Sequence, residues 1–194
     1  MARFKKACAF LTALAVTAVS LFIPTFGAAA EGAGDLVPDW FNEDQRTTWW
    51  ATDSFTGEDN DRFNITVSGG VWTYTQHHNT KDFGIAQSHG TQYNLDLSVN
   101  PYLNFVTDMV GESAYIKLCC RDENHKQKNI EVALIQAGKQ TVSVDLTQNY
   151  DIMKAAGADK KLHLYGVVFT TDKFGADESL SFTNFRFTSQ KETN

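Results

Sequence analysis

Arg62–Gln76 reads RFNITVSGGVWTYTQ, two runs of alternating apolar and polar residues joined by a glycine pair. This alternation is typical of strands with one buried face. If Gly69-Gly70 alone forms the turn, Val67 lies opposite Trp72, and Trp72 and Tyr74 both join the core. A three-residue turn would shift the register and turn both aromatic side chains outward. Glycine pairs suit the two-residue type I′ turn, so we predict a hairpin with both rings buried.

The rest of the chain repeats this strand pattern at short intervals, with turn residues between the runs. Helical periodicity is limited to Tyr150–Ala156, which ends before a glycine. The other predicted strands are 47–52, 83–87, 94–97, 102–108, 114–120, 129–135, 140–145, 161–170 and 179–187. Many short strands with one helical turn predict an all-β fold, an antiparallel β-sandwich of the jelly-roll type with one short helix.

Two predicted strands show which side chains face the core, since successive side chains point to opposite faces. In Ala114–Cys120 one face carries Ile116, Leu118 and Cys120, and the other carries Tyr115, Lys117, Cys119 and Arg121. In Asn129–Ile135 the alternation places Ile130, Val132 and Leu134 inward and Glu131 and Ala133 outward. The loop 121–129 joins the two strands as a hairpin.

The last predicted strand has two pairs of apolar residues that differ in parity. Leu180 and Phe182 share one face, whereas Phe185 and Phe187 share the other. A β-bulge near Thr183-Asn184 would bring all four to the core side, and we predict one there.

The N-terminus has the layout of a secretory signal peptide. Three basic residues precede the apolar run Ala9–Pro24, and the small residues Gly27–Ala30 follow it. The apolar run is short for a membrane-spanning helix, so cleavage after Ala30 is the favoured interpretation. We therefore predict a signal peptide at 1–30, a polar leader at 31–46 and a β-sandwich domain at 47–190, in a protein that is secreted and extracellular.

The charge balance excludes two classes of partner. The chain has 17 basic and 23 acidic residues, and removal of residues 1–30 leaves 14 basic ones, a formal charge of −9. An acidic domain without basic clusters argues against nucleic acid and against anionic membrane surfaces. A monomer that contacts no membrane after signal cleavage is expected.

The two cysteines of the predicted mature chain, Cys119 and Cys120, are adjacent. Neighbouring cysteines cannot link distant segments, so the chain is not a disulfide scaffold. On a strand they point to opposite faces, which predicts one buried and one more exposed thiol. A strained vicinal disulfide is the alternative.

Several segments resemble the galactose-binding-like β-sandwiches, a group that includes many carbohydrate-binding modules of secreted bacterial glycan-degrading systems. The resemblance rests on the entry LDLSVNPYLNF at Leu95–Phe105 and on the closing SLSFTNFRF at 179–187, with SAYIKLCC, QTVSVDLTQ and KLHLYGVVF between them. It covers about Arg62 to Phe187, and its motifs mark strands rather than a binding site. It implies a sandwich fold and glycan binding.

No cofactor or metal is predicted. The modules that the chain resembles often hold a structural calcium through an Asp in the last strand, where this chain has Thr183. The acidic loop Gly57–Asp61 stays open as an alternative calcium site, although it lacks the spacing of a calcium loop. His77 and His78 are adjacent and diverge on a strand, so they do not chelate one ion together.

A sugar-binding surface needs an exposed aromatic ring for the apolar face of the sugar and polar side chains for its hydroxyls. Trp49-Trp50 is the strongest such signal, because in an extended segment one indole can be core while the other is exposed. The outward row Tyr115, Lys117 and Arg121 is the second signal. His77 and His78, at the end of the predicted hairpin, complete the candidate ligand residues.

Three functions follow from these patterns. The favoured one is a secreted, non-catalytic protein that resembles carbohydrate-binding modules and binds a glycan or polysaccharide by aromatic stacking and polar side chains. The second is a small secreted polysaccharide hydrolase or lyase, for which Glu131 is the candidate acid. The sequence offers no second outward-facing carboxylate in the middle of a strand, and a catalytic pair assembled from loops stays open as the alternative. The third is a cell-surface protein-interaction or adhesive domain.

Overall fold

The computed structural model describes residues 34–42, 49–51, 63–76, 80–85, 92–122, 124–174 and 178–193. Every strand pairing in these ranges is antiparallel. In chain order the elements are η1 (Asp39–Phe41), β1 (Trp49–Ala51), β2 (Phe63–Ser68), β3 (Val71–Gln76), β4 (Thr80–Ile85), β5 (Tyr93–Asp96), β6 (Tyr102–Arg121), β7 (Gln127–Asp145), η4 (Leu146–Gln148), α1 (Tyr150–Ala156), β8 (Lys161–Phe174) and β9 (Ser179–Thr188).

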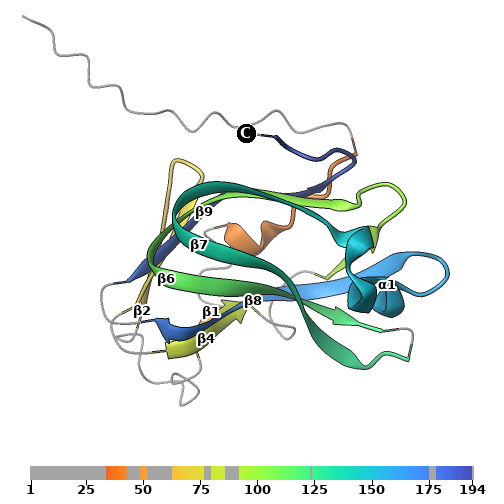
Figure 1. Cartoon of the computed structure of the whole chain (residues 1–194), viewed down its shortest axis with the longest axis horizontal. Coiled ribbons are helices and arrows are strands. Elements are labelled where there is room, and N and C mark those ends of the chain that lie inside the picture. The colour runs from red at the N-terminus through yellow and green to blue at the C-terminus, as the bar shows by residue number, and fades with distance from the viewer. Residues whose placement is uncertain are drawn as a thin grey trace, which may run out of the picture.

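The long strands β6 and β7 run side by side and curve, so that each contributes one half to each of two layers (Figure 1). On the edge of β6 opposite β7, the neighbouring strand changes near Gly111. Residues 102–110 pair with β9, and residues 115–121 pair with β8. Gly111 and Gly138 lie at the register shift between β6 and β7 and have φ angles of 149° and 87°, which favour glycine. The segments 102–108 and 114–120 were predicted as separate strands, and that division is wrong, because β6 continues through Gly111.

We name the two layers by their strands. Layer 1 contains β1, β4, β5 and β8 with the second half of β6 and the first half of β7. Layer 2 contains β2, β3 and β9 with the other halves of β6 and β7.

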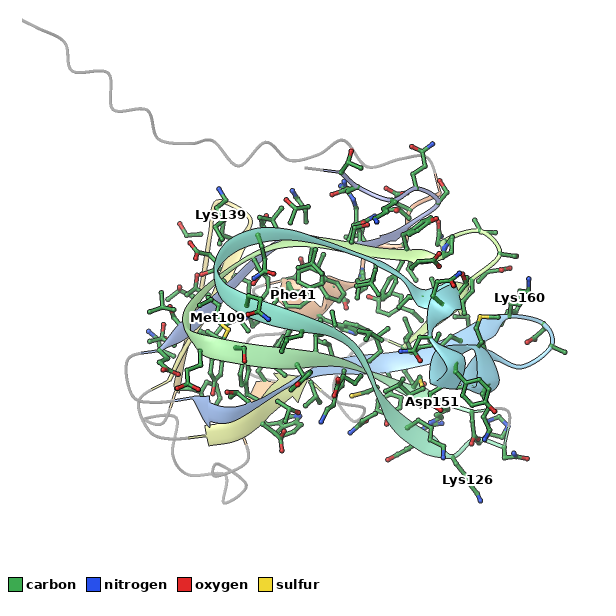
Figure 2. The ribbon with its side chains drawn as sticks, in the orientation of Figure 1. Phe41, Met109, Lys126, Lys139, Asp151 and Lys160 are labelled. Carbon is green, nitrogen blue, oxygen red and sulfur yellow. The ribbon has the colours of Figure 1, made fainter. Side chains whose placement is uncertain are left out.

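Aromatic side chains from the two layers meet in the core. The ring centroids lie 4.0 Å apart for Phe83 and Tyr74, 5.0 Å for Trp49 and Trp72, and 4.6 Å for Phe169 and Phe182. Phe41, from η1, lies between the layers and contacts both Trp49 and Phe182 (Figure 2). The predicted antiparallel β-sandwich with one short helix is therefore confirmed.

The Gly69-Gly70 hairpin has the predicted register. Val67 is the partner of Trp72, and the two glycines have φ angles of 57° and 76°, as a type I′ turn requires. Trp72 and Tyr74 are buried. Outside the core, the hydroxyl of Thr73 shares a hydrogen bond with that of Ser181.

The predicted bulge in the last strand is also present. Asn184 has a φ angle of 57°, and the register between β6 and β9 shifts at this position. Asparagine tolerates the left-handed region better than most residues. As a result Leu180, Phe182, Phe185 and Phe187 are all buried.

A bulge in β7 corrects two assignments of faces. Ala133 pairs with Ile116 but Glu131 pairs with Lys117, so the extra residue Val132 reverses the parity that follows it. Leu134 was predicted to point inward, and this is wrong: it pairs with Tyr115 and is 40% exposed. Ala133, which was predicted outward, is partly buried against the core.

The prediction for the cysteines is also wrong in one respect. Cys119 and Cys120 are free thiols, and both are buried. They do point to opposite faces: Cys120 belongs to the core between the layers, and Cys119 lies under Tyr165 and Val168 on the outer face of layer 1. Burial raises the pKa of each thiol to about 12.

The segment 34–42, part of the predicted polar leader, packs onto the sandwich. Leu36 forms an isolated bridge with Phe187, and Trp40 is fully buried. The predicted signal peptide, the loop 57–61 and the pair His77-His78 lie outside the described residues. Neither η1, η4 nor α1, the helices in the described ranges, has the length and apolar character to cross a bilayer.

Candidate functional site on the outer face of layer 1

The outer face of layer 1 carries a continuous row of residues that are partners in strand register. Each of the five residues is the Cα partner of the next one, so all of them point to the same face. In order from β1 to β7 they are Trp50, Gly84, Val168, Lys117 and Glu131. We call them the Trp50 row. It begins with an aromatic ring and ends with a cation beside an anion.

Gly84 lets β4 and β8 approach each other closely beside Trp50. A Cβ atom at Gly84 would lie 2.3 Å from the carbonyl oxygen of Val167 and 2.9 Å from the Cα of Val168, so only glycine fits here. Trp50 is the Cα partner of Gly84 and packs against the cluster of Cys119, Tyr165 and Val168. The ring is thus held against the sheet and is half-buried.

The neighbouring row adds exposed apolar surface. Tyr115 on β6 is the partner of Thr170 on β8 and of Leu134 on β7. Tyr115 and Leu134 are 39% and 40% exposed, so the two side chains form an exposed apolar pair on this face. The hydroxyl of Thr170 is buried and has no hydrogen-bond partner among the described residues.

A third row, the Arg121 row, lies near the tip of the β6–β7 hairpin. Its members in register are Asn94, His163, Arg121 and Gln127. The ring nitrogens of His163 lie 2.9 Å from Oδ1 of Asn94 and 2.8 Å from Oε1 of Gln92. Desolvation lowers the pKa of His163, and the positive charges of Arg121 and His125 lower it further.

The outer face of layer 2 differs in both composition and cover. Its central row in register is Thr66, Thr73, Ser181, Asp108 and Lys139, small or charged residues without an aromatic ring. Nearby, the chain's own C-terminal segment covers Asn104. The amide of Asn104 donates to Thr188 Oγ1 at 2.6 Å and to the carbonyl of Gln190 at 3.0 Å, and Asn104 is fully buried. Layer 1 is therefore the better candidate for a ligand surface.

The predicted ligand residues fall into three groups. Trp49 is a core residue: it is 5% exposed, and its indole N–H donates to the carbonyl of Trp40 at 3.0 Å. Trp50 lies on the opposite face, together with Tyr115, Lys117 and Arg121. His77 and His78 form the third group and lie outside the described residues.

Other residues of this face were missed by sequence reasoning. Leu134 was assigned to the core because a bulge is invisible to simple alternation. His163 lies in a strand with apolar neighbours, and its proximity to Arg121 depends on the pairing of β6 with β8. A histidine of opposite parity to Leu162 and Leu164 was the available signal.

The hydrolase hypothesis requires two carboxyl groups about 5 to 9.5 Å apart. Glu131 is exposed and lies opposite Lys117. Asp82 on β4, in the neighbouring row, lies three strand spacings from β7, or about 14 Å. Glu131 and Asp82 are therefore too far apart to act as such a pair. Nor do the described residues contain a group of three or more metal-ligating side chains.

Solved structures that this chain matches include carbohydrate-binding modules of family 29. A mutant of one such module in complex with mannohexaose has 14% identity and a TM-score of 0.41, over 66% of this chain and 77% of that chain. A mutant in complex with cellulohexaose has 13% identity and a TM-score of 0.40, over 66% and 76%. A family 29 module without a named ligand has 12% identity and a TM-score of 0.40, over 66% and 74%. No protein-family model and no curated protein sequence matches the chain.

Proposed function

We propose that this chain is a secreted, non-catalytic protein that binds a glycan across the outer face of layer 1. Trp50 and Tyr115 offer rings to the apolar faces of sugar residues, and Lys117, Glu131 and Arg121 offer hydrogen bonds to the hydroxyls. The observation that supports the proposal is the Trp50 row. It places the Trp50 ring and the oppositely charged residues Lys117 and Glu131 on one face of five paired strands.

The dimensions of the face favour a short oligosaccharide over a single sugar. Trp50 on β1 and Lys117 on β6 are separated by three strand spacings, about 14 Å. Tyr115 lies two residues from Lys117, about 7 Å along β6. A ligand that touches both rings and the Lys117–Glu131 pair therefore extends across the strands.

The direct test is isothermal titration calorimetry of the mature protein with a panel of soluble polysaccharides, of the wild type and of Tyr115→Ala. Tyr115 is exposed, so its truncation removes little packing within the protein. We expect the affinity of Tyr115→Ala to fall about tenfold, equivalent to about 1.4 kcal/mol. Lys117→Ala is expected to weaken binding to a similar degree because it removes a charged hydrogen-bond donor.

Two matched controls lie away from this face. Val110→Ala truncates an apolar residue that is 59% exposed on layer 2, and Lys191→Ala removes an exposed cation from the C-terminal segment. Both are expected to bind like the wild type. An unchanged affinity in Tyr115→Ala and Lys117→Ala, or a failure of every polysaccharide to bind, would refute the proposal.

A further inference from the structure

A pocket of about 630 Å³ opens at the end of the Arg121 row. It lies between the tip of the β6–β7 hairpin, the start of β8 and the turn that follows α1. Figure 2 labels Lys126 in the hairpin tip and Lys160 in the turn. Polar walls come from Gln92, Arg121, Asp122, His125, Asp159, Lys161 and His163, and Ala155–Ala158 form an apolar side. Its size is within the range of pockets that bind small organic ligands.

Groups that carry or acquire positive charge outnumber the acids in this pocket. Four such groups line it: Arg121, His125, Lys161 and His163. With histidine neutral, Arg121 and Lys161 balance Asp122 and Asp159, so the pocket has no net formal charge, whereas the whole chain has a formal charge of −6. The pocket is therefore less negative than the average of the chain, and its two fixed cations can accept an anionic ligand.

The two carboxylates of the pocket are engaged by their own turns. Asp122 accepts hydrogen bonds from the backbone N–H groups of Asn124 and Lys126, each at 2.9 Å, and these bonds help to lower its pKa. Asp159 accepts one from the backbone N–H of Lys161 at 3.3 Å. Neither carboxylate forms an ion pair with Arg121 within the described part of the chain.

Arg121 has an unsatisfied hydrogen-bond donor. Its Nε atom is buried and has no hydrogen-bond partner among the described residues. Its direct partner across the strands is His163, so two groups that can both be cationic face each other. Burial lowers the pKa of His163, and the charge of Arg121 lowers it further, which favours the neutral imidazole. An anion in the pocket would give Arg121 the acceptor that its Nε–H lacks.

We propose that this pocket binds the carboxylate of an acidic sugar, a uronate residue in the glycan that occupies the Trp50 row. Arginine suits this role because its planar guanidinium can hold a carboxylate through two parallel hydrogen bonds. Lys161 adds a second positive charge, and Gln92 lies where it can meet sugar hydroxyls. The assignment rests on the proposed glycan-binding function and specifies its ligand class.

The test compares two ligands that differ only in charge. One is an oligo-uronate, and the other is the same oligosaccharide after chemical reduction of its carboxyl groups to primary alcohols. Calorimetric titration of the wild-type protein is expected to show the acidic ligand binding about tenfold tighter or more. In Arg121→Gln, which keeps a hydrogen-bonding side chain without the charge, this preference is expected to disappear while binding of the reduced ligand persists.

Lys191→Gln is the matched control, because it removes one exposed cation from the C-terminal segment. This variant should keep the preference for the acidic ligand. Equal binding of the two ligands to the wild type would overturn the uronate assignment and leave glycan binding intact. Binding of neither ligand would overturn both. If Arg121→Gln does not fold, Lys161→Gln decides: a reduced preference supports the assignment, and an unchanged preference overturns it.

Discussion

Replacing Gly84 by alanine tests whether strands β4 and β8 approach each other as closely as the Trp50 row requires. The added methyl group would lie 2.3 Å from the carbonyl oxygen of Val167 and 2.9 Å from the Cα of Val168. Both are main-chain atoms, so the collision cannot be relieved by a change of rotamer. The strands have to separate, and Trp50 then loses its packing against Val168 and Tyr165.

The size of the effect follows from this geometry. Overpacking of a well-ordered interior usually costs about 1 to 3 kcal/mol, and a backbone collision belongs at the upper end. We therefore expect Gly84→Ala to lower the free energy of unfolding by about 3 kcal/mol. For a chain of this length the melting temperature should fall by about 6 to 12 °C.

Urea unfolding followed by tryptophan fluorescence measures the free energy, and glycan titration of the folded variant measures the effect on the site. The double variant Gly84→Ala/Val168→Ala is the internal control: because the nearest clashing atoms are main chain, removing the valine side chain should not restore stability. A loss below about 0.5 kcal/mol in Gly84→Ala, or full rescue by Val168→Ala, would show that the strands are not packed in this way.

Three further predictions address the core and the bulge. Trp49→Phe is expected to lower the free energy of unfolding by about 3 kcal/mol, because it leaves the buried carbonyl of Trp40 without its indole donor and opens a cavity. The glycan affinity of the folded variant should be unchanged. Thermal unfolding measures the first effect and glycan titration the second. Asn184→Ala is expected to lower the free energy of unfolding in urea by about 1 kcal/mol, whereas Asn184→Gly should stay close to the wild type, because the residue has a φ angle of 57°. Equal effects of the two substitutions would contradict a strained backbone at this position. Burial raises the pKa values of the Cys119 and Cys120 thiols to about 12. Iodoacetamide at mildly alkaline pH should therefore modify neither thiol in the native protein and both thiols in urea. Rapid modification of the native protein would contradict their burial.

Much of the fold was predictable because its signals are local. The Gly69-Gly70 turn, the parity change at Thr183-Asn184 and the helix Tyr150–Ala156 each depend on residues close together in sequence. The wrong predictions for Leu134 and for the division of β6 have a common cause, a bulge or a bend at a glycine. Such irregularities change the parity or continuity of a strand without a distinct mark in composition.

The candidate site was only partly visible from the sequence. Tyr115, Lys117 and Arg121 share one face of a single strand, so alternation alone groups them. The choice between Trp49 and Trp50 could not be made locally, because both residues belong to the same extended segment and face opposite ways. It required the pairing of β1 with β4, which places one indole against Trp72 and the other against Tyr165 and Val168 on the outer face.

By itself, then, the sequence determined the all-β class, the glycine-pair hairpin and the grouping of polar residues on the outer side of β6. Only the tertiary structure decided which strands lie beside β6, and with them the Trp50 row and the contact between Arg121 and His163. The physical reason is the range of the interactions. Alternation and turn chemistry act over a few residues, whereas the order of strands depends on packing and hydrogen bonds between segments more than forty residues apart.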